Sequence, residues 1–437
     1  MDVVSWTKNS RFMYDSIRRN PLRYGRIRAV LEGLQDAPLD RRIAFCQQRL
    51  KAIQRGAGRT PYGRPHQHLP IESWPILEKQ GLRGHERDLL TRPTWLSCHG
   101  QTSGTTGTPL TVYRSFDSLV LEQVCIDRVA AKQGFDLRTC RIAVLRGDNI
   151  KPPADTEPPF WRPGEGGRTD IFSSSHLTPA NLSWYVAELR RFAPHCLFCY
   201  PSSLQALCAM LEMQGEMLHI PLVMTSSEVL EPATVALAKR MLDCQFADYY
   251  GQCERVAFAE TAASGGYIFT PGYAHVELKF SRSEDDDELY EIIGTNLWNT
   301  AMPMVRFRTG DLITVPAGTS NEHLEQIRHG LRPFTRIHGR DDGIFIHGVG
   351  GTRLFGMPKI MNGVRNVYQS QIVQEALDRV TILIVPTLHF SNADREQILA
   401  NARTKIPESI TVSVVTGQRL ETTRAGKSPF IIRKIAS

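Results

Sequence analysis

The chain has no long apolar segment. None of its segments approaches the roughly 20 consecutive apolar residues that a transmembrane helix requires, and its mean hydropathy is -0.26. The first 21 residues also lack the apolar core of a signal peptide. We therefore expect no membrane association and a cytoplasmic location.

The cysteines show no disulfide framework. The nine cysteines are an odd number, they are scattered, and none follows Cys253, so we expect them to be reduced. Cys196 and Cys199 have the spacing of a metal-binding pair, but no second pair exists. Leu197 and Phe198 between them favour a buried strand over a zinc site.

Two common nucleotide-binding motifs are missing. Gly426-Lys427-Ser428 ends like a Walker motif, but position 421, where that motif needs glycine, is Glu421. Gly348 and Gly350 begin like a dinucleotide fingerprint, which Arg353 interrupts. Internal repeats and low-complexity tracts are missing as well.

Acidic residues are fewer than basic ones. Lys and Arg number 52 against 45 Asp and Glu, a net charge of +7, which could indicate nucleic acid, an acidic surface or an anionic small ligand. Arginines crowd the first 42 residues, where they alternate with apolar residues such as Ile27, Leu31 and Leu34 at helical spacing. This pattern favours a solvated helix face over a nucleic-acid site.

Residues 115–250 alternate between strand-like and helix-like segments. Helical stretches, such as one over 178–192 with Thr178 as N-cap and Pro179 in its first turn, separate short β-type runs. This alternation predicts a parallel sheet with covering helices. The β-type runs are 141–145, 196–200, 221–225 and 245–249.

The pattern changes after residue 270. Residues 274–280 and 289–295 alternate by twos around an acidic turn, and 305–308 continue the pattern, which predicts a small antiparallel subdomain. The glycine-rich loop 339–351 is typical of a domain boundary. Beyond it we expect a strand over 380–386, a helix over 392–406, a strand over 410–415 and a basic tail. The predicted fold is α/β: a large N-terminal domain of mainly parallel sheets with covering helices and a small β-subdomain, then a small α+β domain.

The strongest local motif is a loop after His99. Two glycines stand among hydroxyl side chains over residues 102–108, so that backbone N–H groups and hydroxyls can converge on phosphate oxygens. Taken alone, the loop could equally be an ordinary surface turn.

Four further motifs follow in order. They are Tyr250-Gly-Gln-Cys-Glu254, Arg308-Thr-Gly-Asp311, Gly339-Arg-Asp-Asp342 and Thr423-Arg-Ala-Gly-Lys427. With the loop they resemble the core motifs of the adenylate-forming superfamily of acyl-CoA synthetases, adenylation domains and luciferases. The segments TSGTTGTPL, YPSSL and YYGQCERVAFAE are most similar to its phenylacetate-CoA ligase and CapK-like branch, and the resemblance covers about residues 95–430.

The resemblance implies an ATP- and Mg²⁺-dependent enzyme. A small-molecule carboxylic acid would be activated as an acyl-adenylate with release of pyrophosphate, and the acyl group would pass to coenzyme A. Thr102 to Thr108 would enclose the β- and γ-phosphates, Tyr250 would lie along the adenine, and Asp311 would bind the ribose. The implied nucleotide-binding residues are Thr102, Ser103, Gly104, Thr105, Thr106, Gly107, Thr108, Ser227, Glu228, Tyr250, Gly251 and Asp311.

The resemblance also implies catalytic roles and a movement. Glu254 would ligate Mg²⁺, which prefers carboxylate and phosphate oxygens, Arg340 would reach the phosphate or ribose, and Lys427 would serve the adenylation step. Asp342 would be the hinge between an adenylation domain over 1–340 and a mobile lid domain over 341–437.

Several alternatives stay open. Singly, Glu254 could be a helix-start acid, Asp311 a turn residue and Lys427 a solvated lysine. The acceptor could be an amine, a hydroxyl or an acyl-carrier protein thiol, and the protein could be a silent nucleotide-binding scaffold. His176 could line an acyl pocket, although a capping or hydrogen-bonded loop histidine is favoured.

Two positions depart from the family pattern. The phosphate loop often carries a lysine where this chain has Thr108 or Leu110, which leaves less positive charge to meet pyrophosphate. Cys253 stands where the family more often has a small or hydroxyl residue. These departures bear on rate and substrate rather than on class.

Overall fold

The computed structural model describes residues 16–101, 110–148, 150–152, 154–284, 286–340, 345–350, 352–354, 357–422 and 427–435. The chain divides into two compact units. Unit 1 comprises Met1–Thr139 and Ala247–Gly339, and unit 2 comprises Cys140–Phe246 and Arg340–Ser437. Within the described ranges, no helix is both long and apolar enough to cross a membrane.

Unit 1 begins with helices. Asn20 caps the first of them, because its side chain accepts a hydrogen bond from the backbone N–H of Arg23, and a proline opens the helix. One face of this helix buries Ile27, Leu31 and Leu34. The helices of the unit are α3 (Pro21–Gln35), α4 (Leu39–Ala57), α5 (Lys79–Leu82), α6 (Phe116–Ala131) and α10 (Asn321–Arg328), with 3₁₀ turns at Arg64–His66, Ile71–Ser73, Glu86–Leu89 and Thr94–Leu96.

The crowded arginines are mostly on a solvated helix face, as predicted. Arg23 and Arg26, for example, are largely exposed and both pair with Asp117. Arg42 is different, because it is buried and donates from Nη1 to the carbonyl of Gly330 at 2.7 Å. For this residue the prediction was wrong, since its guanidinium satisfies backbone carbonyls in the interior.

Unit 1 also holds antiparallel strands. An acidic turn joins two long strands, and the register of this hairpin runs from Ala274 opposite Asn296 to Glu284 opposite Asp287. The predicted small β-subdomain is therefore present, although its third strand begins at Phe307 rather than at 305 and extends to Pro316. The strands are β1 (Cys98–Gln101) with β2 (Thr111–Arg114), β9 (Phe258–Thr261) with β10 (Tyr267–Phe269), and the sheet β11 (Ala274–Glu284), β12 (Asp287–Asn296), β13 (Phe307–Pro316) and β14 (Arg336–Arg340).

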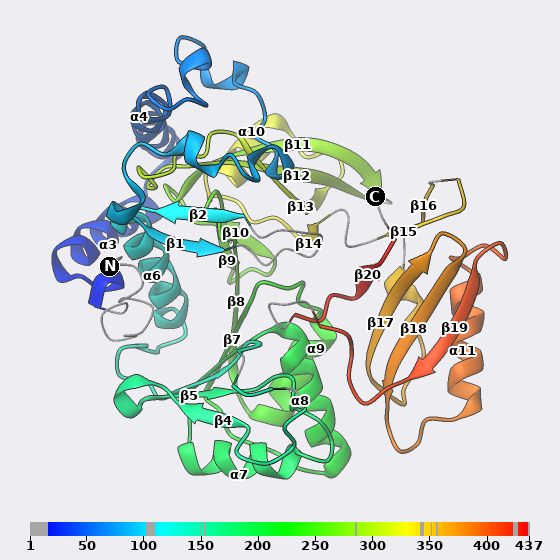
Figure 1. The fold of residues 1–437 in the computed structure, drawn as a ribbon. Helices are drawn as coiled ribbons and strands as arrows, with labels where there is room; N and C mark the ends of the chain where they lie inside the picture. The colour runs from blue at the N-terminus through cyan, green and yellow to red at the C-terminus, as the bar shows by residue number, and fades with distance from the viewer. Residues whose placement is uncertain are drawn as a thin grey trace. The chain divides into compact units, whose positions relative to one another are not determined.

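A parallel sheet with helices forms the first part of unit 2. Its strands run in the order β7, β6, β3, β5, all parallel, and β4 pairs antiparallel at the edge. Figure 1 shows α8 beside α9. The elements are β3 (Ile142–Leu145), β4 (Trp161–Pro163), a 3₁₀ turn (Glu165–Gly167), β5 (Thr169–Phe172), α7 (Leu182–Phe192), β6 (Cys196–Cys199), α8 (Pro201–Gln214), β7 (Leu222–Ser226), α9 (Pro232–Leu242) and β8 (Gln245–Gly251), which ends in unit 1.

The start of α7 differs from the prediction. The helix begins at Leu182 rather than at Thr178, because residues 178–181 form a turn in which the backbone N–H of Asn181 donates to the carbonyl of Thr178. The Asn181 side chain donates to the carbonyl of His176 and does not cap the helix.

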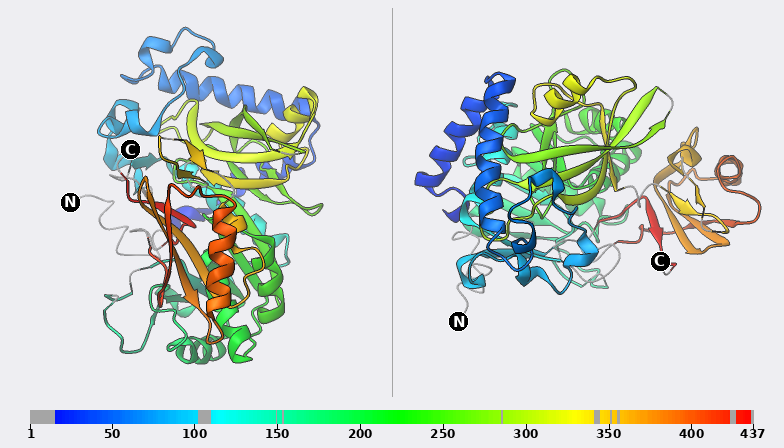
Figure 2. Two further views of the ribbon diagram at one scale, coloured as in Figure 1. Left: turned by 90° about the vertical axis from the view of Figure 1, so that its right-hand side faces the viewer. Right: turned by 90° about the horizontal axis from the view of Figure 1, so that it is seen from above.

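The C-terminal segment of unit 2 has a sheet and a core of its own. Figures 1 and 2 show α11 against one face of β17 to β19, and Ile398 and Ala402 of the helix belong to the same buried apolar cluster as Ile382. The strand order is β19, β18, β17, β20. The elements are β15 (Ile346–His347), β16 (Arg353–Leu354), a 3₁₀ turn (Met357–Met361), β17 (Val367–Ala376), β18 (Arg379–Pro386), α11 (Asn392–Arg403), β19 (Thr411–Thr416) and β20 (Ile431–Arg433).

The predicted α/β class is confirmed, with a large part built on parallel strands and a small C-terminal part. Within unit 2 the small part packs on the parallel sheet and its helices through Tyr368, Val385 and Leu420.

Candidate active site

Tyr250 and Asp311 meet in unit 1. The phenol of Tyr250 donates to Oδ2 of Asp311 at 2.6 Å, and the side-chain amide of Gln252 donates to the phenol oxygen at 3.0 Å. Burial, together with the negative charge of Asp311, raises the pKa of Tyr250 well above its usual value. The phenol therefore keeps its proton and stays a donor to the carboxylate.

An irregularity in β13 presents Asp311. Residue 308 pairs with Ile293 and Leu312 pairs with Glu291, so the register shifts between these pairs. Gly310 has φ +76, a conformation that favours glycine. The backbone N–H of Asp311 donates to the hydroxyl of Thr309, which donates to the carbonyl of Ile292. The Arg-Thr-Gly-Asp motif is thus a fixed bulge with a carboxylate at its end.

Glu254 follows β8 in the same unit and is buried. Its Oε1 lies 3.2 Å from the ammonium of Lys79, at the start of α5. The preceding residue is held by Arg114, whose guanidinium donates to the carbonyl of Cys253 at 2.9 Å. The next residue, Arg255, is buried and has φ +57. Glu254 therefore sits between two anchored neighbours.

Ser227, Glu228 and Lys427 meet in unit 2. The ammonium of Lys427 donates to the carbonyl of Ser227 at 2.9 Å and lies 5.6 Å from the ring centre of Tyr200. Ser227 has φ +74, an uncommon conformation for a residue with a side chain. Nη2 of Arg146 also donates to the Ser227 hydroxyl, at 3.0 Å.

Glu228 lies at the N-terminus of α8. The backbone N–H of Ser202, in the first turn of that helix, donates to Glu228 Oε2 at 2.9 Å. Burial raises the pKa of Glu228, while the hydrogen bond from Ser202 and the nearby ammonium of Lys427 oppose the shift. The motif residue Lys427 and the two residues after β7 therefore form one polar cluster.

Several predicted site residues lie outside the described part of the chain. These are the loop residues Thr102 to Thr108 and the hinge candidate Asp342; Arg340 ends β14, and only its backbone is described. The loop joins β1 to β2, which pair antiparallel with Gln101 opposite Thr111. Gly251, another predicted residue, ends β8, and a Cβ there would lie 3.5 Å from Phe258.

Cys196 and Cys199 lie buried on β6, as predicted, and all nine cysteines are unbridged. His176 is buried in unit 2, where Nδ1 lies 2.7 Å from the hydroxyl of Ser173 and its ring stacks on Phe160. This confirms a hydrogen-bonded loop histidine.

A metal would have few protein ligands here. In the described residues no group of three or more His, Cys, Asp or Glu side chains could hold a metal ion. The buried carboxylate of Glu254 is a hard oxygen donor, and Mg²⁺ bound with a nucleotide takes one or two carboxylates and completes its shell with phosphates and water. Glu254 fits such a role, with Lys79 as its present partner.

Sequence reasoning missed the residues that hold the site in place. Lys79 and Gln252 in unit 1, and Arg146 and Tyr200 in unit 2, contact predicted site residues, and Arg114 holds Cys253, the residue before Glu254. Gln252 stands inside a motif and could have been suspected. Tyr200 opens the YPSSL segment and could have been suspected too, whereas Lys79, Arg114 and Arg146 come from segments with no motif, so that only the fold of each unit brings them to their partners.

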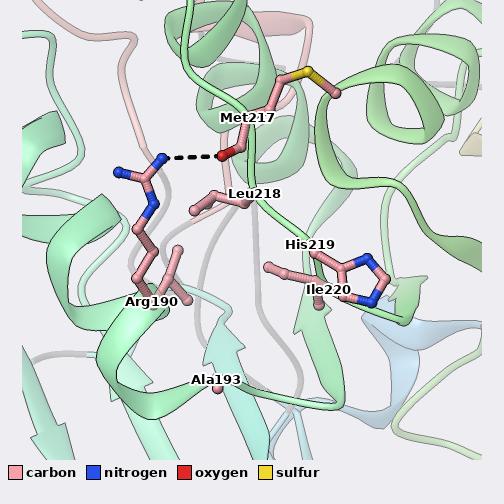
Figure 3. Close-up of a pocket in the computed structure, with 7 residues that line it drawn as sticks. Arg190, Ala193, Met217, Leu218, His219 and Ile220 are labelled. Carbon is pink, nitrogen blue, oxygen red and sulfur yellow. Dashed lines mark hydrogen bonds between the residues drawn. The ribbon is translucent and has the colours of Figure 1, made fainter.

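The pocket in Figure 3 is not part of this site. It lies in unit 2 beside the C-terminal end of α7 and has a volume of about 200 Å³. Arg190 donates to the carbonyl of Met217 at its rim. Its lining holds none of the predicted site residues.

Known proteins match the chain in sequence and in fold. A family model for the CapK C-terminal domain matches residues 350–434. Protein CapK of Staphylococcus aureus is 21% identical over 336 residues, which cover 75% of this chain and 72% of that protein.

Solved structures of 2-hydroxyisobutyryl-CoA ligase in the postadenylation state share the fold. The complex with R3-HIB-AMP has a TM-score of 0.62 at 14% identity, and the alignment covers 92% of this chain and 91% of that one. The complex with 2-HIB-AMP has a TM-score of 0.60 at the same identity and coverage. The chain therefore has a C-terminal segment that matches the CapK C-terminal domain, is similar to protein CapK over most of its length, and shares the fold of these solved structures.

Proposed function

We propose that the protein uses ATP to convert a carboxylic acid into an acyl-adenylate and then passes the acyl group to coenzyme A. The observation that carries this proposal is the meeting of Tyr250 with Asp311 in the unit that also holds Glu254. These residues come from two separate motifs, yet the fold brings them together. The negative charge of Glu254 also contributes to the raised pKa of the Tyr250 phenol.

The first reaction joins two anions. A carboxylate oxygen attacks the α-phosphorus of ATP, the bond from that phosphorus to the bridging oxygen breaks, and pyrophosphate leaves with the electron pair. The site must hold both groups in line and offset their repulsion. Asp311, fixed by its bulge and by Tyr250, would accept hydrogen bonds from the ribose hydroxyls, and the loop over 102–108 would donate to the phosphates.

Glu254 would hold a magnesium ion, which neutralises phosphate charge when it is bound. Lys427 would bridge the carboxylate and the α-phosphate in this reaction. In unit 2 its ammonium already lies beside Ser227 and Glu228, two predicted nucleotide-binding residues. Ser227 and Glu228 would therefore help to place the nucleotide relative to Lys427.

The second reaction is acyl transfer. The thiolate of the acceptor attacks the acyl carbonyl carbon, and AMP leaves. Coenzyme A is the simplest acceptor, since the solved ligase of the same fold is named as a CoA ligase and was crystallised with acyl-AMP compounds. ATP and coenzyme A are both cytoplasmic compounds, which supports a cytoplasmic location.

The proposal assigns different roles to two parts of the chain. Residues 1–340 would bind ATP and the acid, and residues 341–437 would form a lid that turns at Asp342 between the two reactions. The separate sheet and core of the C-terminal segment support this division, because a part with its own core can move as a unit.

The proposal can be tested by ATP–pyrophosphate exchange over a panel of aryl, fatty and amino acids, with and without coenzyme A. We expect exchange that depends on one class of acid and on Mg²⁺, and acyl-CoA formation when the thiol is added. Exchange without acyl-CoA would assign a different acceptor, namely an amine, a hydroxyl or a carrier-protein thiol. ATP binding without exchange for any acid would indicate a silent scaffold.

A further inference from the structure

The carboxylate of Glu254 has a cationic partner that no motif contains. Lys79 Nζ lies 3.2 Å from Glu254 Oε1, and the two side chains are only 18% and 5% exposed. A lysine and a glutamate removed from water in this way attract each other strongly, and each compensates the burial of the other. Any cation that binds Glu254 must therefore compete with Lys79.

Lys79 is held at this place by its neighbours. Two residues before Lys79, the backbone N–H of Leu77 donates to the carbonyl of Arg306. The carbonyl of Leu77 accepts a hydrogen bond from the backbone N–H of Arg308. Glu78 pairs with the Arg308 guanidinium at 2.9 Å. Lys79 then opens α5, whose Leu82 packs in the same apolar cluster as Leu77. The backbone at Lys79 is thus fixed, while its ammonium is carried on a flexible four-carbon stem.

The same apolar cluster contains the stem of the phosphate loop. Leu110 and Val112, which follow the loop, are buried with Leu82 and with Val256, two residues after Glu254. The base of Lys79, the loop stem and the Glu254 segment are therefore packed together in unit 1. Residues 102–110 contain no lysine or arginine, so this segment has no positive side chain of its own.

We propose that Lys79 is a polyphosphate-binding residue that rests on Glu254 until a nucleotide binds. This inference depends on the proposed function. When Glu254 takes the metal ion that accompanies ATP, Lys79 loses its partner and its ammonium turns to the β- and γ-phosphate oxygens. Lys79 thereby supplies the positive charge that the phosphate loop lacks, and the pair with Glu254 keeps both buried groups neutralised beforehand.

The proposal predicts two opposite effects of Lys79→Ala. ATP binding to the full-length protein, measured by calorimetry with saturating Mg²⁺, should weaken roughly 10- to 100-fold, because a charge-assisted contact is lost. Binding of Mn²⁺ without nucleotide, measured by electron paramagnetic resonance, should tighten several-fold, because the competitor for Glu254 is gone. Lys79→Arg should retain most of the ATP affinity, and Lys79→Gln should behave like Lys79→Ala if the alanine variant is unstable.

Lys132→Ala is the matched control. Lys132 also pairs with a buried glutamate of unit 1, at 3.0 Å from Glu260, which keeps Arg128 as a second partner. This variant should bind ATP and Mn²⁺ like the wild type, and thermal unfolding checks that all variants are folded.

The outcomes separate this inference from the proposed function. If the wild type binds no ATP, the adenylation proposal fails and this inference fails with it. If the wild type binds ATP and Lys79→Ala binds it equally well, only this inference is overturned. A folded Lys79→Ala protein that binds both ATP and Mn²⁺ more weakly would also overturn it, because the lysine would then only support the shape of the site.

Discussion

Three carboxylates in this protein have three different kinds of partner. Asp311 accepts from the phenol of Tyr250, Glu254 pairs with Lys79, and Asp170 shares its surroundings with Glu188 and Arg191. The first two belong to the proposed site, and the third is structural.

Glu254→Gln should lower the rate of acyl-adenylate formation strongly, on the order of 100-fold, and raise the Mg²⁺ concentration needed for half-maximal rate. The amide keeps the shape of the side chain and loses the charge that a magnesium ion needs. A Mg²⁺ titration of pyrophosphate exchange measures both effects. Glu284→Gln, at an exposed ion pair with Arg282, is the control and should change neither. An unchanged Mg²⁺ titration for Glu254→Gln would remove this residue from the site.

Asp170 gives the stability a pH dependence. Burial, followed by its hydrogen bond and repulsion with Glu188, raises the pKa of Asp170 to about 6. The pKa of an aspartate in the unfolded chain is about 4. Between pH 4 and pH 6, the folded state therefore keeps a proton on Asp170 that the unfolded state has lost. The stability from this group is therefore largest near pH 4 and falls as the pH rises to about 6.

Asp170→Asn should remove this fall. The wild type should lose free energy of unfolding on the order of 1 kcal/mol between pH 5 and pH 7, a modest value because the exposed Arg191 side chain offsets part of the repulsion. The asparagine variant should show a flatter curve in urea unfolding at the two pH values. Parallel curves for both proteins would mean that Asp170 titrates at its ordinary pKa.

The motif residues could be predicted one by one, but their partners could not. Tyr250 and Asp311 stand in recognisable segments, so the sequence predicted both as nucleotide-binding residues. The sequence around Lys79 has no motif, and its place beside Glu254 depends on how α5 packs on the cluster around Leu77 and Val256. Such a pairing follows only from the packed fold.

At the scale of elements, strands made of apolar residues were predicted well from the sequence, and strands that contain polar residues were predicted poorly. The strand predicted over 380–386 is β18, Arg379–Pro386. The neighbouring β17 was missed, because two of its glutamines, Gln371 and Gln374, are fully buried and hydrogen bond to backbone groups. Buried amides that satisfy main-chain atoms look like surface residues in a sequence pattern. β20, only three residues long, was taken for part of a basic tail.

The hairpin of β11 and β12 leaves no room at one glycine. A Cβ at Gly294 would lie 2.1 Å from the carbonyl oxygen of Val256. Gly294→Ala should therefore shift the strand and lower the free energy of unfolding by about 1–3 kcal/mol. Gly25, in α3, has open space around the same position, so Gly25→Ala should raise stability by about 0.5–1 kcal/mol. Urea unfolding measures both changes, and equal stability of Gly294→Ala and the wild type would show that β12 can move freely.

At the scale of the whole molecule, the C-terminal segment brings one lysine to the proposed chemistry. Lys427 contacts Ser227 and lies near Tyr200, while the segment rests on the rest of unit 2 through Tyr368 and Leu420. If this segment is the lid that we propose, the contact belongs to one of two arrangements. Lys427 should then act in only one of the two reactions.

Lys427→Ala should nearly abolish pyrophosphate exchange, by about 10²- to 10³-fold, because one contact to developing charge is lost. Supplied with synthetic acyl-AMP, the same variant should still transfer the acyl group at a near-normal rate. Lys434→Ala, which removes an exposed tail lysine paired with Glu421, is the control and should affect neither step. An equal loss in both reactions, or none in exchange, would contradict the role of Lys427.

The central claim, that a carboxylate attacks the α-phosphate of ATP, can be tested with an isotope. The acid that supports the fastest exchange is labelled with oxygen-18 in both carboxylate positions, and the products of one turnover with coenzyme A are examined by mass spectrometry. Because the acyl-adenylate keeps the bond between carboxylate oxygen and phosphorus until the thiol attacks, the account predicts AMP that carries one oxygen-18 atom. Unlabelled AMP, or label found in phosphate beside ADP, would contradict it.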